Sequence, residues 1–173
     1  MSAKFYYFDA SALVKVYVRE PGSAWVRSLL GVGGEGEQPA QAILIAEASV
    51  AEVAAAFAVL YRTGRIRRKA WDGAFDQFMD DVHWRYQLIR TTQDDFFAAA
   101  ALTCHYPLKA YDAVQLAVAL RYARILAAFG FPLTFVSGDA TLLNAAQAEG
   151  LPTENPFDHV APEDMPSTSR SPA

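Results

Sequence analysis

The chain has 173 residues, of which 53% are hydrophobic, and its formal net charge is −4. This size suits one domain with a substantial core, and the negative charge excludes a general attraction for nucleic acid. The single Cys104 excludes an internal disulfide, and the first residues do not resemble a signal peptide. Because Glu47 and Glu52 interrupt the longest apolar stretch, we expect no membrane span and a cytoplasmic protein.

The first half of the chain alternates strand and helix patterns. The expected elements are a strand over 4–9, helices over 11–19 and around 25–30, a strand over 42–45 and a helix over 49–61. Four glycines between Gly31 and Pro39 predict a surface loop there.

The second half continues the alternation. A helix should carry Trp71, Phe75 and Phe78 as core or subunit contacts. The further elements are strands over 86–89, 133–137 and 152–155, and helices over 93–104, 110–129 and 139–148. This order predicts an α/β fold whose mainly parallel sheet has helices on both faces. We expect one domain over residues 1–158 and a disordered tail over 159–173, where core residues are few.

Four carboxylates occupy positions that an α/β fold would bring together. Asp9 and Asp139 each follow an expected strand, at the sheet edge where parallel-sheet proteins bind ligands. Taken singly, each acid has a structural explanation: Asp9 and Asp139 as helix N-caps, and Asp112 as a favourable charge in a first turn. Glu52 would close a capping box with Ser49.

Taken together, the four acids predict a metal site. Glu52 and Asp112 lie in otherwise apolar helices, where acids are normally paired or coordinated. Only Lys109 is near Asp112 in sequence, and no basic residue lies one turn from Glu52, so a metal cation is the expected partner. Carboxylates suit Mg²⁺ or Mn²⁺, which can activate water for phosphodiester hydrolysis. Glu47 is an alternative for the second acid.

Four segments resemble the motifs of PIN domains, and in particular of VapC toxins: Tyr7 to Lys15, Ser49 to Val53, Tyr111 to Ala119 and Phe135 to Asp139. The resemblance covers roughly residues 4–155 and implies a three-layer PIN-like fold. It implies a Mg²⁺- or Mn²⁺-dependent endoribonuclease with catalytic and metal-binding Asp9, Glu52, Asp112 and Asp139, supported by Ser11 and Ser137. It also implies an RNA substrate, a homodimer and a VapB-like antitoxin as partner.

A basic cluster follows the Glu52 helix and consists of Arg62, Arg65, Arg67, Arg68 and Lys69. It could hold RNA phosphates, in which case binding would weaken with salt. It could equally be a solvated helix end, because a turn between helices exposes its charges in any protein.

Two other functions compete with the ribonuclease. One is a phosphoacceptor domain with Asp9 as the aspartyl nucleophile, although Asp139 stands where such a domain needs a lysine. The other is a non-cleaving RNA- or protein-binding module, which would be expected to lack one or more of the acids.

Overall fold

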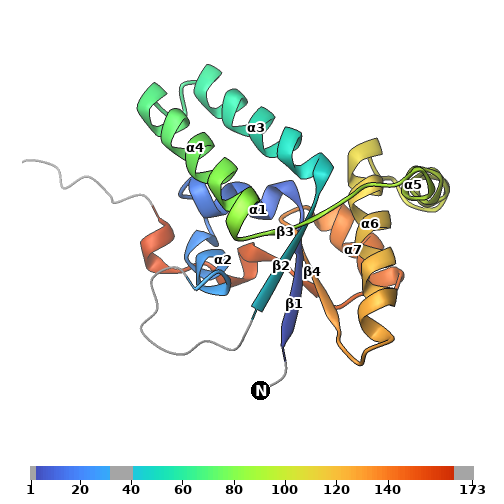
Figure 1. Ribbon diagram of the computed structural model, residues 1–173. Coiled ribbons are helices and arrows are strands. Elements are labelled where there is room, and N and C mark those ends of the chain that lie inside the picture. Colours follow the sequence, from blue (N-terminus) through green and yellow to red (C-terminus); the bar gives the residue numbers. More distant parts are fainter. Residues whose placement is uncertain (1–2, 32–40, 166–173) are drawn as a thin grey trace, which may run out of the picture.

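The structure is a computed structural model that describes residues 3–31 and 41–165 (Figure 1). Within these residues the strands form one five-stranded parallel sheet in the order β3-β2-β1-β4-β5. The strands are β1 (Lys4–Phe8), β2 (Gln41–Ala46), β3 (Gln87–Ile89), β4 (Leu133–Val136) and β5 (Thr153–Glu154). The predicted α/β fold with a mainly parallel sheet is confirmed.

Seven α-helices are described: α1 (Ala10–Tyr17), α2 (Ser23–Leu29), α3 (Glu47–Arg62), α4 (Arg68–Trp84), α5 (Gln93–His105), α6 (Ala110–Ala127) and α7 (Ala140–Ala148). Most bounds lie within a few residues of the prediction. The start of α3 differs, because the helix begins at Glu47 directly after β2 and has no side-chain cap. None of the helices in the described part of the chain is long and apolar enough to cross a membrane.

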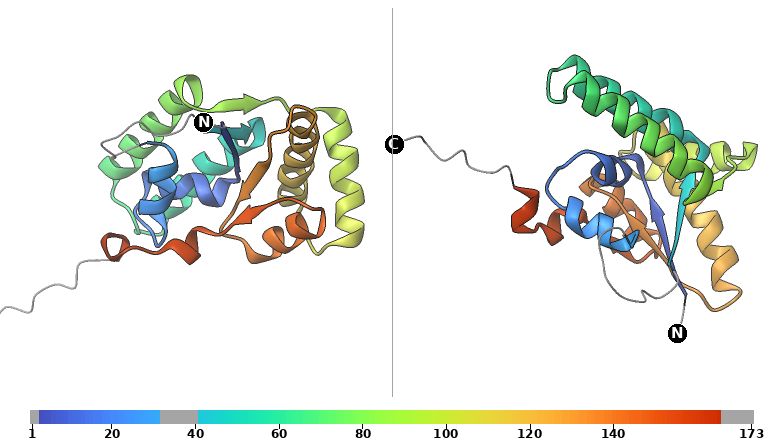
Figure 2. Two further views of the ribbon diagram at one scale, coloured as in Figure 1. Left: turned by 90° about the horizontal axis from the view of Figure 1, so that it is seen from below. Right: turned by 60° about the vertical axis from the view of Figure 1, so that its left-hand side comes forward.

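The sheet lies between two layers of helices, which bury separate cores. On one face, α1 to α4 pack on side chains such as Phe8 and Ile45, with Phe57 and Phe78 fully buried between the helices. On the other face, α5, α6 and α7 cover Tyr7 and other strand residues. Figures 1 and 2 show these layers, and also α3 and α4 lying side by side as a hairpin that projects beyond the sheet.

The segment after β5 corrects the predicted disordered tail over 159–173. Residues 155–165, here called the C-terminal strap, form two short 3-10 helices, η1 (Pro156–His159) and η2 (Pro162–Asp164). The buried carboxylate of Asp164 accepts hydrogen bonds from the backbone N–H groups of Gly22 (3.0 Å) and Ala24 (2.8 Å) at the start of α2. Local composition missed this strap because its anchor lies far away in the sequence. The remainder of the predicted tail, and the predicted loop after Gly31, lie outside the described residues.

Candidate active site

The strand order places β1 beside β4, so the residues that leave these strands meet at the carboxyl edge of the sheet. Phe8 is in register with Val136, and the backbone N–H of Asp9 donates to the carbonyl of Val136 (3.2 Å). Asp9 and Ser137 are therefore neighbours, although 128 positions separate them in sequence. Parallel sheets bind their ligands at this edge.

Asp9 is the centre of a buried hydrogen-bond network. Its side chain is 5% exposed and accepts from the hydroxyl groups of Ser11 (2.7 and 2.9 Å) and Ser137 (2.7 Å). The backbone N–H of Ala12 also donates to it (2.9 Å), which confirms Asp9 as the N-cap of α1. Ser11 and Ser137, predicted as supporting residues, thus fix the orientation of the Asp9 carboxylate.

Asp139 joins the same network through its backbone. Its N–H donates to the hydroxyl of Ser137 (3.0 Å), while its side chain accepts from Thr141 and Leu142 and so caps α7, as predicted. The hydroxyl of Ser11 accepts from the Gly138 N–H (2.8 Å), which ties the loop after β4 to α1. Both helix starts are therefore held at the Asp9 carboxylate.

Glu52 is held by a contact that the sequence did not predict. The amide nitrogen of Gln115 donates to Glu52 (2.6 Å) and to Ser49 (2.8 Å), and its amide oxygen accepts from the Tyr7 hydroxyl (2.6 Å). The predicted capping box of Ser49 and Glu52 is wrong, because α3 begins two residues before Ser49. The sequence signal for the contact with Glu52 was Gln115 itself, a polar residue three positions after Asp112 in an apolar helix.

Burial and mutual repulsion act on three of the four acids. Burial raises the pKa of Asp9 from 3.8 to about 6, against the hydrogen bonds from Ser137, Ala12 and Ser11, and the charge of Asp112 adds to the increase. Burial also raises the pKa of Glu52, which Gln115 opposes and Asp9 and Asp112 reinforce. Asp112 has a raised pKa through burial and the charge of Asp139, with Lys109 opposing. These charges are close enough to disfavour one another's ionisation.

The side chains do not form a finished metal cage. In the part of the chain that the structure describes, no three His, Cys, Asp or Glu side chains are grouped closely enough to hold an ion. Within the same part of the chain Asp9 makes no ion pair, so hydrogen bonds alone stabilise its charged form. Carboxylate and hydroxyl oxygens are the donors that Mg²⁺ and Mn²⁺ prefer. The chemistry of the donor atoms therefore suits such an ion.

The basic cluster and Glu47 lie apart from this network. The five basic residues of the cluster are exposed at the α3–α4 connection, where Arg68 pairs with Asp72 (3.0 Å) and Arg65 lies 4.0 Å from Glu20. Glu47 is exposed and accepts from the backbone N–H of Thr91 (3.1 Å). The charges of Asp9 and Asp112 contribute to the raised pKa of Glu52, so Glu52 stays the predicted second acid.

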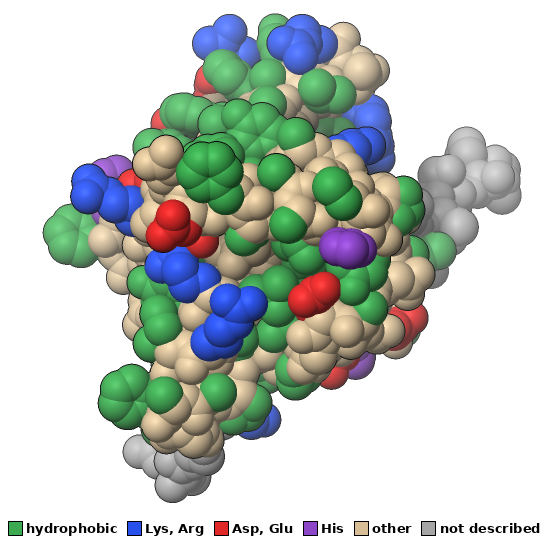
Figure 3. Space-filling model, turned by 90° about the vertical axis from the view of Figure 1, so that its right-hand side faces the viewer, with side chains coloured by type: hydrophobic (Ala, Val, Ile, Leu, Met, Phe, Trp, Pro, Cys, Tyr) green, Lys and Arg blue, Asp and Glu red, His purple; other side chains and the backbone are tan. Residues whose placement is uncertain are grey.

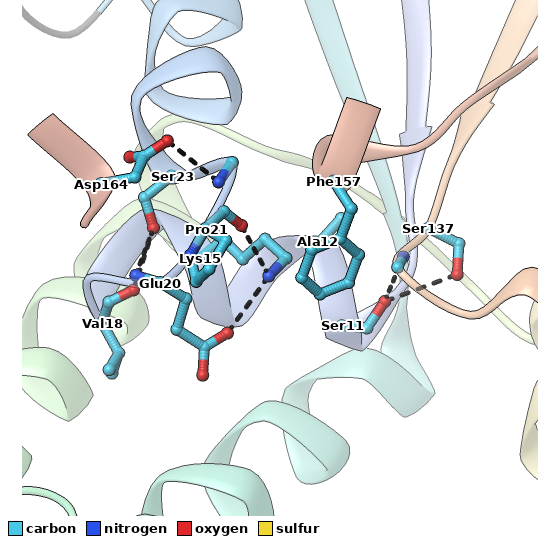
Figure 4. A network of polar contacts seen from close by, with 12 residues as sticks. Ser11, Ala12, Lys15, Val18, Glu20, Pro21, Ser23, Ser137, Phe157 and Asp164 are labelled. Atoms are coloured by element: carbon cyan, nitrogen blue, oxygen red, sulfur yellow. Dashed lines mark hydrogen bonds and ion pairs between the residues drawn. The ribbon is translucent and has the colours of Figure 1, made fainter. Parts of the chain in front are cut away.

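A pocket of about 490 Å³ opens beside the network, and Ser11 and Asp139 contribute to its wall. Lys15, which the sequence analysis did not single out, also lines it. The Lys15 ammonium is buried and donates to Glu20 (3.3 Å) and to the carbonyl of Pro21 (3.0 Å) (Figure 4). The sequence signal for a buried lysine at this pocket was the position of Lys15, four residues after Ser11 in an apolar helix.

These features define an α/β domain with Asp9 and Asp139 at the carboxyl edge of a parallel sheet, and comparison with solved structures confirms the predicted PIN-like fold. FitAcB from Neisseria gonorrhoeae is 15% identical, with a TM-score of 0.56, over 88% of this chain and 99% of that chain. VapBC2 from Rickettsia felis, bound to a DNA fragment from their promoter, is 14% identical, with a TM-score of 0.56, over 87% and 98%.

PAE2754 from Pyrobaculum aerophilum is 18% identical, with a TM-score of 0.54, over 90% of this chain and 85% of that chain. At this level of identity the likeness concerns the fold. The sequence matches none of the family models and none of the curated proteins with which it was compared.

Proposed function

We propose that this protein is a Mg²⁺- or Mn²⁺-dependent endoribonuclease and the toxin of a toxin–antitoxin pair. The observation that carries the proposal is the buried Asp9, which makes no ion pair among the described residues and whose pKa is raised, chiefly by burial, to about 6. Acids in such surroundings are normally paired with a cation or coordinate a metal. The four acidic motifs and the PIN-like fold are consistent with that role.

Each acid has a distinct position in the proposed site. Asp9 and Asp112 would be the main metal ligands, with Glu52 and Asp139 completing the set. When bound, the ion would activate water and stabilise the charge that develops on the leaving oxygen. Ser11 and Ser137 hold the Asp9 carboxylate in place, and Gln115 holds Glu52. The chain thus supplies orientation at Asp9 and Glu52 before any ion arrives.

Cleavage of labelled single-stranded RNA tests this proposal. We expect wild-type protein to cut in Mn²⁺ or Mg²⁺ and to stop in chelator. Asp9→Asn and Asp112→Asn should lower the rate of cutting by about 100-fold or more. Asp76→Asn, which removes an exposed acid on α4, should leave the rate unchanged. Equal cutting in chelator, or unchanged cutting by the two site variants, would contradict the proposal.

The basic cluster supplies a candidate RNA-binding surface. The cluster runs from the end of α3, the helix that carries Glu52, through the connection and into the start of α4. All five side chains are exposed. Basic side chains that neutralise phosphates make binding weaken as salt is raised. Replacing Arg65 and Arg67 with glutamine should weaken RNA binding and flatten its salt dependence, whereas a solvated helix end would show neither change.

The expected partners are a VapB-like antitoxin and a second copy of the chain. The neighbour named VapBC2 supports the first, because VapBC is the toxin–antitoxin system that the sequence motifs resemble. Figure 3 shows the side of the molecule that carries α5 to α7, where hydrophobic side chains lie between charged ones. Phe96 (55% exposed) and Phe97 (66% exposed) on α5 are candidates for a dimer contact, which light scattering of Phe97→Asp would test.

The remaining alternatives have less support. A phosphoacceptor domain would require a cation where Asp139 stands, and Lys15 is already bound to Glu20 and Pro21. A non-cleaving module would have no need for four acids that repel one another. A ribonuclease of this kind would act in the cytoplasm, as the sequence predicts.

A further inference from the structure

The pocket beside Asp139 is unexplained by the acidic site alone. Its volume of about 490 Å³ lies in the range of roughly 300–1,000 Å³ that small-molecule sites occupy. Its lining includes Ser11 and Asp139 from the proposed active site. An apolar part of the lining comes from α3 and consists of Ala56, Val59 and Leu60.

Phe157, an aromatic residue on the C-terminal strap, also lines the pocket. Phe157 is 48% exposed, and its ring lies against the backbone of Gly138, where an added Cβ would be 3.2 Å from Cε2 of the ring. The Lys15 ammonium is 4.0 Å from the ring centroid and is itself fixed by Glu20 (Figure 4). The ring is thus held at the pocket while about half of it stays accessible.

The strap keeps Phe157 in this place. Besides the Asp164 contacts at the start of α2, His159 stacks on Trp25 with ring centroids 4.2 Å apart. Gly22 has φ +88°, and a Cβ there would lie 2.3 Å from the Pro156 carbonyl oxygen, so the strap packs directly on its backbone. Several independent contacts therefore position a half-exposed aromatic ring next to the acids.

We propose that this pocket takes one unpaired nucleobase of the RNA strand, stacked against Phe157, beside the phosphodiester that is cut. The inference rests on the proposed function. A phosphate at the acids would bring the base of an adjoining nucleotide within reach of this pocket, because Asp139 and Ser11 line it. Aromatic rings bind unstacked bases of single-stranded RNA in this way.

The same observations favour a base over an apolar side chain of a protein partner. The pocket is continuous with the acids, so its occupant is best explained as a group covalently attached to the phosphate. The stacking is tolerant of base identity, because every base has a π face. The pocket would therefore require a single-stranded segment rather than a particular sequence.

Two probes test the inference: fluorescent oligoadenylate and an RNA chain of equal length that lacks bases. All proteins in the binding measurements carry Asp112→Asn, so that the RNA probe is not cut. Phe157→Ala should weaken oligoadenylate binding about fivefold to 100-fold and leave the baseless chain unaffected. Phe157→Tyr should retain binding, and Phe129→Ala, which removes an exposed phenylalanine just after α6, should change neither probe.

Equal losses for both probes, or no loss for either, would overturn the pocket assignment. Unchanged binding of the baseless chain also shows that Phe157→Ala is folded. Wild-type cleavage of oligoadenylate in Mn²⁺ is measured in parallel. If cleavage persists while Phe157 has no effect, only the pocket is wrong; if wild type neither binds nor cuts RNA, the proposed function is wrong as well.

Discussion

Two buried aspartates on opposite sides of the sheet have opposite electrostatic surroundings. Asp95 on α5 is 2% exposed and receives two hydrogen bonds of 2.8 Å from the Arg121 guanidinium, together with bonds from Thr92. Burial alone would raise the pKa of Asp95, but Arg121 and Thr92 outweigh it and lower the pKa. Asp9 is similarly buried but is bound by hydroxyls and one backbone N–H, and burial raises its pKa to about 6.

The difference separates a structural acid from a candidate functional one. Asp95 also forms a capping box with Thr92, so both of its carboxylate oxygens take part in hydrogen bonds that stabilise the fold. Asp9 caps a helix too, but its charge is left for another group to neutralise. Acids with perturbed pKa values are frequent at functional sites, which makes Asp9 the candidate for binding a cation.

The largest expected effect is on catalysis. Asp112→Asn should lower the rate of RNA cleavage about 100- to 1,000-fold, because it removes charge where the metal and the reacting phosphate must be held. Asp95→Asn should leave the rate of the folded protein unchanged. Single-turnover cleavage rates, corrected for the fraction of folded protein, compare the two variants. Equal losses of rate in Asp112→Asn and Asp95→Asn would contradict the distinction between the two kinds of acid.

The second effect is on stability at the paired acid. Asp95→Asn leaves Arg121 without its carboxylate and should lower the free energy of unfolding by about 2 to 4 kcal/mol. Urea denaturation at neutral pH measures this change. A stability equal to that of wild type would mean that the ion pair with Arg121 contributes nothing net to the fold.

Asp9→Asn should instead raise the free energy of unfolding. Because the pKa of Asp9 in the folded state lies above 3.8, ionisation of this group destabilises the folded protein. The destabilisation is absent below pH 3.8 and grows as the pH rises to about 6. In chelator at pH 7 the variant should be more stable than wild type by about 1 to 3 kcal/mol. The gain should vanish near pH 4 in urea denaturation, and a loss of stability at pH 7 would contradict the raised pKa.

The smallest effect is stabilisation by the metal itself. A ligand that binds only the folded state at ten times its dissociation constant stabilises it by about 1.4 kcal/mol. Mn²⁺ should therefore raise the melting temperature of wild type but not of Asp9→Asn, while Asp76→Asn should respond as wild type does. An equal response of all three proteins would place the ion away from Asp9.

Local patterns determined the fold class and the position of the acids. Alternating strand and helix segments predict a parallel sheet, and an acid between a strand and the following helix predicts a helix cap at the carboxyl edge, as Asp9 and Asp139 confirm. These features are readable because hydrophobic periodicity and capping depend on residues a few positions apart.

The tertiary structure alone decided how the site is held together. Gln115 joins Glu52 and Tyr7 across 63 and 108 positions of sequence, and Asp164 anchors the strap at Gly22 across 142. The start of α3 at Glu47, rather than at the capping box with Ser49, also follows from the way β2 leads into the helix. Such contacts depend on which segments pack together, and no local spacing encodes that choice.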